Sequence, residues 1–132
     1  ALQAAVLSVK LKYLKADILR RREIANLYLT NISNHCVKLP LSADIGSNVW
    51  HLFVIETECR EELQTFLAKN DIESLIHYPI PPHLQVGLVG LVSGELPVTE
   101  CLSGRVLSLP IDPSMSNESV YLVCDAVNKF KK

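Results

Sequence analysis

The side chains best suited to bind a ligand lie in residues 75–83, which read Leu-Ile-His-Tyr-Pro-Ile-Pro-Pro-His. An imidazole and a phenol, at His77 and Tyr78, stand beside three prolines that fall within four residues. Each proline fixes φ at about −65°, removes a backbone donor and disfavours the α region for the residue before it. We therefore expect a stiff, extended segment that holds His77 and Tyr78 at a fixed angle in a cleft and loses little rotational freedom when a ligand binds.

Two other roles for these polar side chains remain open on the sequence alone. His77 and Tyr78 could form a buried polar pair that supports a rigid turn. A metal site could use His77 and His83 with His51 as a third ligand, although zinc ligands usually stand at closer spacings. His51 itself lies in an apolar run, where a hydrogen-bonded core histidine is a simpler interpretation than a ligand.

Patterns typical of covalent catalysis and phosphate binding do not occur in the sequence. A nucleophilic Ser or Cys needs a base placed against it, and no G-x-S-x-G pattern announces one. The five glycines form no phosphate-cradling loop. The triplet Arg20-Arg21-Arg22 could bind phosphate, but a solvated helix face is the simpler interpretation.

Length and composition indicate one globular domain. The chain has 132 residues, 48% of them hydrophobic, and a net charge of −1, which argues against a dedicated nucleic-acid or anionic-membrane binder. No apolar run approaches the roughly 20 residues that a membrane-spanning helix needs. The four cysteines lack a C-x-x-C pair, which favours reduced thiols and a cytoplasmic location. They are Cys36, Cys59, Cys101 and Cys124.

Residues 1–34 are expected to form one long helix, bent near Ala16-Asp17. Apolar side chains recur there at helical spacing. They are Leu2, Val6, Val9, Tyr13, Leu14, Ile18, Ile24, Leu27 and Tyr28. Such a helix would be roughly 45–50 Å long, so part of it should pack on a structure outside this chain. It is also basic: it carries six basic and two acidic side chains, a net +4, whereas the other residues together carry −5.

Residues 35–132 are expected to alternate strands and helices around a small sheet. The expected strands cover residues 37–39, 48–56, 72–76 and 105–109, and the expected helices cover 60–69, 97–104 and a last helix capped by Ser116. Cys59 is a poor N-cap for the first of these helices. Gly87, Gly90 and Gly94 predict a loosely ordered flap over residues 84–96. Because hairpin and crossover links both fit, we assign an α/β fold with α+β character and leave the strand order open.

The proline-rich segment resembles a motif of a known enzyme family. Residues 76–83 are similar to the His-Tyr-Pro-x-Pro-x-His segment of the DegT/StrS group of PLP-dependent nucleotide-sugar aminotransferases, which are fold-type-I enzymes. Other family elements have counterparts in the same order along the chain. They are the Gln-Ala-Ala helix at 2–14 and its continuation at 20–25, the His-Leu-Phe/Tyr-Val strand at 50–55, Pro-Val-x-Glu within 96–100 and Leu-Ser-Leu-Pro within 106–110. The resemblance therefore covers essentially the whole chain.

The resemblance implies that residues 1–132 are the small C-terminal domain of such an enzyme, with 1–34 as a linking helix and 35–132 as the α/β body. Pyridoxal phosphate (PLP) and the lysine that forms its Schiff base would lie in an N-terminal domain absent from this chain, because no lysine here shows the family's lysine motif. Residues 1–132 alone would then bind no cofactor and would not transaminate. The complete enzyme is expected to be a homodimer.

The same resemblance implies a reaction and a set of site residues. The complete enzyme would transfer an amino group, typically from glutamate, to a nucleotide-linked keto sugar for lipopolysaccharide or other cell-surface polysaccharide biosynthesis. His77 and Tyr78 would bind the substrate, and Pro79 and His83 would support the turn. Residues 86–94 depart from the family pattern, so the identity of the sugar stays open. The alternative is a catalytically inert, stand-alone module that binds a nucleotide sugar or serves as a scaffold.

Overall fold

The computed structural model describes residues 2–41, 46–88 and 94–132. The α-helices are α1 (Leu2–Lys10), α2 (Leu14–Asn31), α3 (Arg60–Ala68), α4 (Pro97–Arg105) and α5 (Asn117–Lys129). The strands are β1 (Phe53–Glu56) and β2 (Val106–Leu109), and two short 3-10 helices are η1 (Pro82–Leu84) and η2 (Val86–Leu88). Helices around a small sheet agree with the expected fold class.

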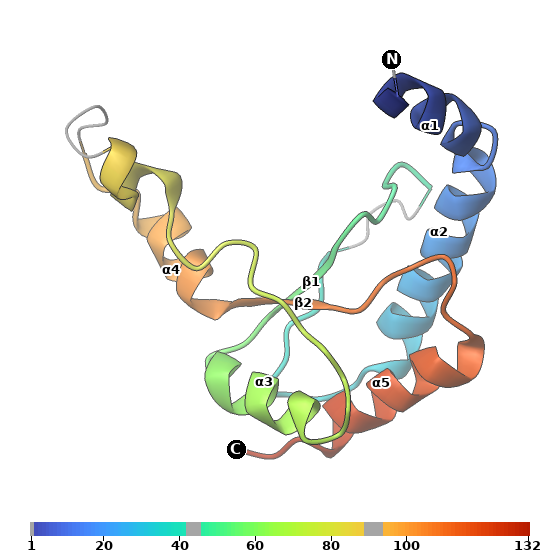
Figure 1. Cartoon of the computed structure of the whole chain (residues 1–132). Coiled ribbons are helices and arrows are strands. Elements are labelled where there is room, and N and C mark those ends of the chain that lie inside the picture. The colour runs from blue at the N-terminus through green and yellow to red at the C-terminus, as the bar shows by residue number, and fades with distance from the viewer. Residues whose placement is uncertain (1, 42–45, 89–93) are drawn as a thin grey trace.

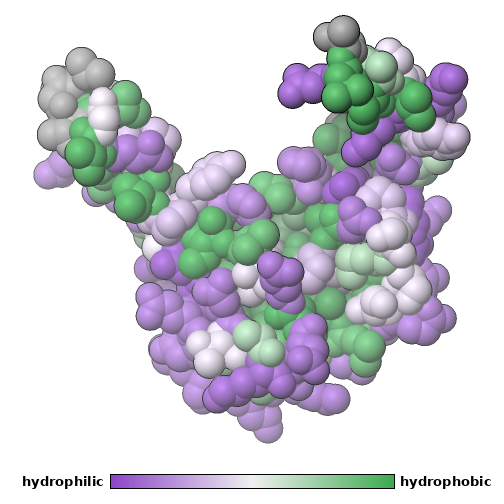
Figure 2. All heavy atoms as spheres, viewed as in Figure 1, coloured by the Kyte–Doolittle hydropathy of each residue, from purple (hydrophilic) through white to green (hydrophobic). Residues whose placement is uncertain are grey.

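Two arms project from one side of the body, which contains the sheet, α3 and α5 (Figure 1). The N-terminal arm consists of α1 and the first turns of α2. The second arm consists of η1, η2 and α4. Apolar side chains gather at the ends of both arms (Figure 2). Exposed apolar surface of this kind is typical of a face that contacts another structure.

The N-terminal helix is interrupted at residues 11–13, not at the expected bend near Ala16-Asp17. In the interruption the amides of Lys12 and Tyr13 donate to carbonyls three residues back, at 3.2 and 3.0 Å, as in a 3-10 turn. Asp17 instead lies in the first turn of α2, where a carboxylate suits the positive end of the helix dipole. The helix then ends at Asn31. None of the described residues of α1 is buried.

The two strands pair antiparallel, with Phe53 opposite Leu109 and Ile55 opposite Leu107. Single bridges extend this sheet on both sides, from Lys38 to Glu56 and from Leu75 to Ser108. The expected extended pieces at 37–39 and 72–76 therefore lie at the sheet edges, and the antiparallel pairing resolves the strand order.

The expected strand over residues 48–56 is regular only from Phe53. Trp50 has a φ of 51°, in the left-handed region, and interrupts the extended backbone. His51 is exposed, so its interpretation as a core histidine was wrong. Trp50 nevertheless contributes to the core, because its ring lies 5.5 Å from that of Phe53, measured between centroids.

The core forms where α2, α3 and α5 cover the sheet. The stripe expected on the last helix is buried in full. It consists of Val120, Val123, Val127 and Phe130. The Ser116 hydroxyl accepts a hydrogen bond from the Ser119 amide at 3.2 Å, which confirms the predicted N-cap of α5. Cys59 makes no side-chain cap for α3, as its thiol predicts.

The arginine triplet fastens α2 to the loops of the body. Arg20 Nη2 donates to the Met115 carbonyl at 2.6 Å, and Arg21 Nη1 donates to the Ile111 carbonyl at 2.7 Å. Arg22 Nε donates to the Asn48 carbonyl at 2.9 Å. The interpretation as a solvated helix face was therefore wrong, since these guanidinium groups serve as links within the fold.

No helix within the described ranges combines the length and the apolar character needed to cross a membrane.

Candidate functional site

The bridge between Leu75 and β2 positions His77. The Leu75 amide donates to the Ser108 carbonyl at 3.2 Å, and the Ser108 amide donates to the Leu75 carbonyl at 2.8 Å. Two residues further on, Nδ1 of His77 lies 3.0 Å from Oγ of Ser108, which belongs to a buried residue of β2. This hydrogen bond fixes the imidazole against the sheet. Within the described part of the chain, no hydrogen bond engages the other ring nitrogen, Nε2.

Tyr78 lies in solvent next to His77. Its residue is 72% exposed, and its ring meets the His77 ring edge-on, with centroids 5.5 Å apart. The two residues are joined by a cis peptide bond. They are not a sealed polar pair, because the phenol is accessible and the imidazole is only half-buried.

His77 and Tyr78 form part of a groove of about 260 Å³ between the proline-rich turn and α4, which we call the turn–α4 groove. The turn contributes one wall, and α4 with the start of β2 contributes the other. The lining residues are His77, Tyr78, Ile80, Pro81, Pro82, Thr99, Leu102, Ser103 and Val106. Such a groove offers hydroxyl, phenol and imidazole groups beside apolar surface, a combination typical of small-molecule sites.

His83 lies at the end of the proline-rich turn, in η1, and contacts α4. Its Nε2 is 2.9 Å from Oε1 of Glu100, and its side chain is only 8% exposed. Because a carboxylate only accepts hydrogen bonds, Nε2 of His83 must carry a proton. The hydrogen bond from His83, followed by one from the Leu96 amide, lowers the pKa of Glu100 below its ordinary value. Pro79 is exposed and lies outside the groove lining.

The histidines do not converge on a metal. His77 contacts Ser108, whereas His83 contacts Glu100. His51 and His77 both line a second groove, of about 220 Å³, whose lining also includes Leu75 and Ser108. No group of three or more His, Cys, Asp or Glu side chains is placed to hold a metal ion in the ranges that the structure describes.

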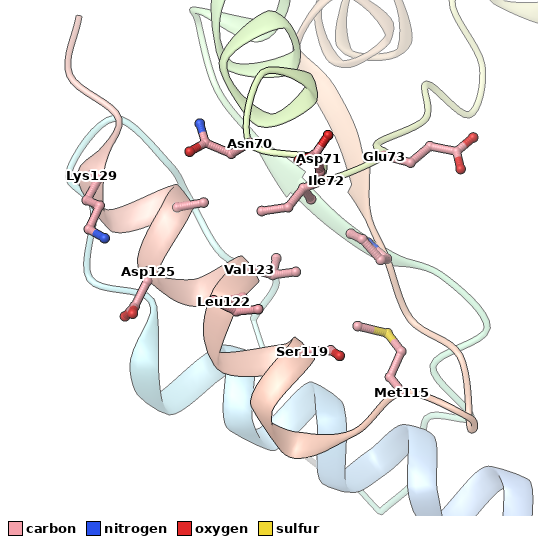
Figure 3. Close-up of a pocket in the computed structure, with 12 residues that line it drawn as sticks. Asn70, Asp71, Ile72, Glu73, Met115, Ser119, Leu122, Val123, Asp125 and Lys129 are labelled. Carbon is pink, nitrogen blue, oxygen red and sulfur yellow. The ribbon is translucent and has the colours of Figure 1, made fainter.

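A larger groove, of about 590 Å³, lies elsewhere, between the turn after α3 and α5 (Figure 3). Charged side chains stand at its rim, among them Asp71, Asp125 and Lys129, around apolar side chains such as Ile72 and Val123. Its lining includes no His, Cys or Tyr. Because it offers no imidazole or phenol, this larger groove matches the expected site less well than the turn–α4 groove does.

Reasoning from single residues missed the partners that hold the site, Ser108 and Glu100. These residues lie 31 and 17 positions from the histidines that they contact. The available signal was their membership of two short stretches, Leu-Ser-Leu-Pro at 107–110 and Pro-Val-x-Glu at 97–100. Each stretch resembles a family element, but the pattern alone does not show which side chain it contacts.

A family model and individual known proteins both match this chain, and both matches are to aminotransferases. The model of the DegT/DnrJ/EryC1/StrS aminotransferase family matches residues 1–128. The dTDP-3-amino-3,6-dideoxy-alpha-D-galactopyranose transaminase of Aneurinibacillus thermoaerophilus is 48% identical over 129 residues, which cover 98% of this chain and 36% of that protein. This chain therefore spans about a third of the length of that relative.

Solved structures show the same fold. The crystal structure of Streptomyces venezuelae DesV in complex with a ketimine intermediate superposes with a TM-score of 0.90 and 38% identity, over 96% of this chain and 35% of that one. The structure of NtdA from Bacillus subtilis, with bound cofactor PMP, gives a TM-score of 0.77 and 27% identity, over 88% of this chain and 28% of that one.

Proposed function

Because this chain belongs to the DegT/DnrJ/EryC1/StrS aminotransferase family, we propose that residues 1–132 form one wall of the substrate cleft in an enzyme that transfers an amino group to a nucleotide-linked keto sugar. The observation that carries the proposal is the exposed Tyr78 beside the anchored His77 at the mouth of the turn–α4 groove. The 48% identical relative acts on a dTDP-linked deoxy sugar. A substrate of the same class is the natural candidate here.

The residues of this chain do not fit PLP as a covalently bound cofactor. A Schiff base needs a lysine in a shielded site, and PLP needs contacts for its phosphate. All eight lysines of the chain are exposed, and none lines the turn–α4 groove or the groove beside it. We therefore propose that the cofactor and its lysine belong to an N-terminal domain outside residues 1–132, and that these residues alone do not transaminate.

His77 and Tyr78 would act on the substrate by binding and orientation. The Ser108 hydroxyl holds the His77 ring, so its free nitrogen can meet a sugar hydroxyl or a diphosphate oxygen without further ordering. The Tyr78 phenol can donate one hydrogen bond and accept others. Pro79 and His83 would support the turn, with His83 held by Glu100.

Further details of the complete enzyme follow from the resemblance and are proposed with it. We propose glutamate as the amino donor, a homodimer as the assembly, and lipopolysaccharide or cell-surface polysaccharide biosynthesis as the pathway. A cytoplasmic location suits the four cysteines, which form no disulfide bond.

The direct test is an assay of the complete polypeptide encoded by the reading frame that contains these residues. The purified protein should absorb as a PLP enzyme and should convert a dTDP-linked keto sugar and glutamate into the amino sugar and 2-oxoglutarate. A reading frame without a lysine-bearing PLP domain would reject the proposal. In that case residues 1–132 would be the binding or scaffold module, which NMR titration with nucleotide sugars would detect at His77 and Tyr78.

A further inference from the structure

The two walls of the turn–α4 groove are joined by one polar contact, between His83 of the turn and Glu100 of α4. The two side chains meet at 2.9 Å, and that of His83 is almost fully buried. Among the described residues, no other hydrogen bond or ion pair links residues 77–88 to α4. The hydrogen bond is therefore the polar link between the turn and the helix in this part of the structure.

The Glu100 carboxylate is held at the start of its own helix as well as by His83. Its Oε1 also accepts from the Leu96 amide at 3.0 Å, at the N-terminus of α4. That end has no side-chain cap from Leu96 and begins with a proline, so the carboxylate supplies the missing acceptor and suits the helix dipole. The helix is tied to the body in turn, because Arg60 donates to the Ser103 carbonyl. Glu100 is thus an anchor with a fixed position, and His83 is the group that it holds.

The α4 wall of the groove presents the Thr99 hydroxyl and, as an acceptor only, the Ser103 hydroxyl, which donates its proton to the Glu100 carbonyl at 2.9 Å. Thr99 precedes Glu100, and Ser103 lies one helical turn after Thr99, so both side chains share one helix face. They line the groove that His77 and Tyr78 line from the turn, with Leu102 between them as apolar surface. A sugar ring carries hydroxyls at its edge and C–H groups on its faces, which is the chemistry that these walls match.

We propose that Glu100 is a positioning residue for the sugar. Through His83 it holds the turn at the distance from α4 at which a sugar ring binds between Tyr78 and Thr99, and Thr99 is a contact that helps to select the sugar. This inference rests on the proposed function, because it assigns the sugar subsite of that same enzyme. It adds two residues of α4, Glu100 and Thr99, to the site residues His77 and Tyr78 of the turn.

The test uses the complete enzyme with a dTDP-linked keto sugar and compares Glu100→Ala, Glu100→Gln and Thr99→Val. Glu100→Ala should raise the KM for the sugar about tenfold, because the turn loses its anchor. The half-reaction with glutamate, followed by the absorbance of the cofactor, should keep its rate. Glu100→Gln retains an oxygen that accepts from His83 and Leu96, so its KM should lie between those of the wild type and Glu100→Ala. Thr99→Val, which removes one hydroxyl, should raise the KM three- to tenfold, as about 1 kcal/mol of lost hydrogen bonding would.

A matched control and the thermal unfolding temperature separate positioning from folding. Glu61→Gln changes an exposed glutamate in the first turn of α3, outside the groove, and should leave the KM unchanged. If Glu100→Ala lowers the unfolding temperature but not the sugar affinity, Glu100 is a structural cap and the inference is wrong. If Glu100→Ala does not fold, Thr99→Val decides, and an unchanged KM in that variant rejects the subsite. A wild type that aminates no nucleotide sugar would instead reject the proposed function itself.

Discussion

At the scale of single residues, Tyr28 joins the N-terminal helix to the core. Its hydroxyl donates to the Pro110 carbonyl at 2.6 Å, and its ring lies 4.9 Å from that of Phe53, between centroids. Burial, and to a smaller extent the negative charge of a Cys124 thiolate, raises the pKa of Tyr28 well above its ordinary value. Burial also raises the pKa of Cys124 to about 11. Both groups thus keep their protons in the folded state.

Stability should therefore decline in alkaline solution. A raised pKa stabilises the folded state fully below the pKa of the unfolded state, and that contribution is lost as the pH rises beyond it. For Tyr28 the loss begins at about pH 10, and for Cys124 it begins about one unit lower. Urea unfolding between about pH 7 and pH 11 should show the free energy of unfolding falling across this range.

Tyr28→Phe tests how much of the alkaline decrease in the free energy of unfolding is due to Tyr28. The variant should lose about 1–3 kcal/mol of stability at neutral pH, because the Pro110 carbonyl loses its donor inside the protein. It should also show a shallower decline above about pH 10, with the part due to Cys124 retained. An alkaline decline as steep as that of the wild type would contradict the assignment to Tyr28.

Tyr78→Phe tests the proposed role of the exposed phenol. In the complete enzyme the variant should reduce turnover of the sugar about tenfold or more, since one hydrogen-bonding group on the substrate wall is lost. The absorbance of bound PLP should not change. Tyr121→Phe removes a partly exposed phenol from α5 and serves as the control. An equal loss of sugar turnover and of cofactor absorbance in Tyr78→Phe would contradict its placement on the substrate wall.

At the scale of helices and strands, local patterns predicted some elements correctly and failed at others. The last helix was predictable because its buried stripe and its cap at Ser116 depend on residues within the helix. The strand predicted over residues 48–56 is longer than the observed β1, because arginine side chains of α2 donate hydrogen bonds to backbone carbonyls that would otherwise pair in a strand. Arg22 donates to the Asn48 carbonyl, and Arg21 reaches that of His51 at 3.3 Å. Contacts from a helix 26 to 30 residues away do not show in an alternating pattern.

Arg21→Ala tests this link between α2 and the loops. Arg21 donates to the Ile111 carbonyl, and its guanidinium lies 3.8 Å from the Asp112 carboxylate. Removing a charged donor from a carbonyl should cost roughly 1.5–3 kcal/mol. Hydrogen exchange at residues 48–52 and 111–114 should accelerate at the same time. Lys12→Ala changes an exposed residue of the helix interruption and should alter neither the free energy of unfolding nor hydrogen exchange in these loops. Unchanged exchange in both loops would show that Arg21 does not hold them.

At the scale of the whole molecule, the candidate site depends on contacts between distant parts of the chain. His77 and Tyr78 could be proposed from the sequence, because prolines and polar rings stand together there. The α4 wall of the groove could not, since a sequence does not show that Glu100 reaches His83 across 17 residues. The apolar spacing of α1 resembles that of α2, but the sequence does not show that, of these two helices, only α2 buries part of its stripe, at Ile24 and Tyr28.

The exposed apolar side chains of α1 give the last prediction. Leu2, Leu7 and Val9 are each more than half exposed, and no residue of α1 is buried, so a polar substitution there removes little apolar contact within the described ranges. Leu7→Glu should therefore leave the free energy of unfolding of the isolated residues 1–132 within about 0.5 kcal/mol of the wild type. In the complete enzyme, where we expect α1 to pack on the PLP domain, the same substitution would bury an unpaired charge and should cost roughly 3 kcal/mol or more.

Gln3→Glu introduces the same charge at another exposed position of α1 and controls for charge alone. Denaturant unfolding of both variants, in the isolated residues and in the complete enzyme, separates the two contexts. A destabilised Leu7→Glu in the isolated chain would mean that α1 folds back on the body. Equal stability in the complete enzyme would mean that the N-terminal arm is solvated there as well, and that its apolar side chains cover no other domain.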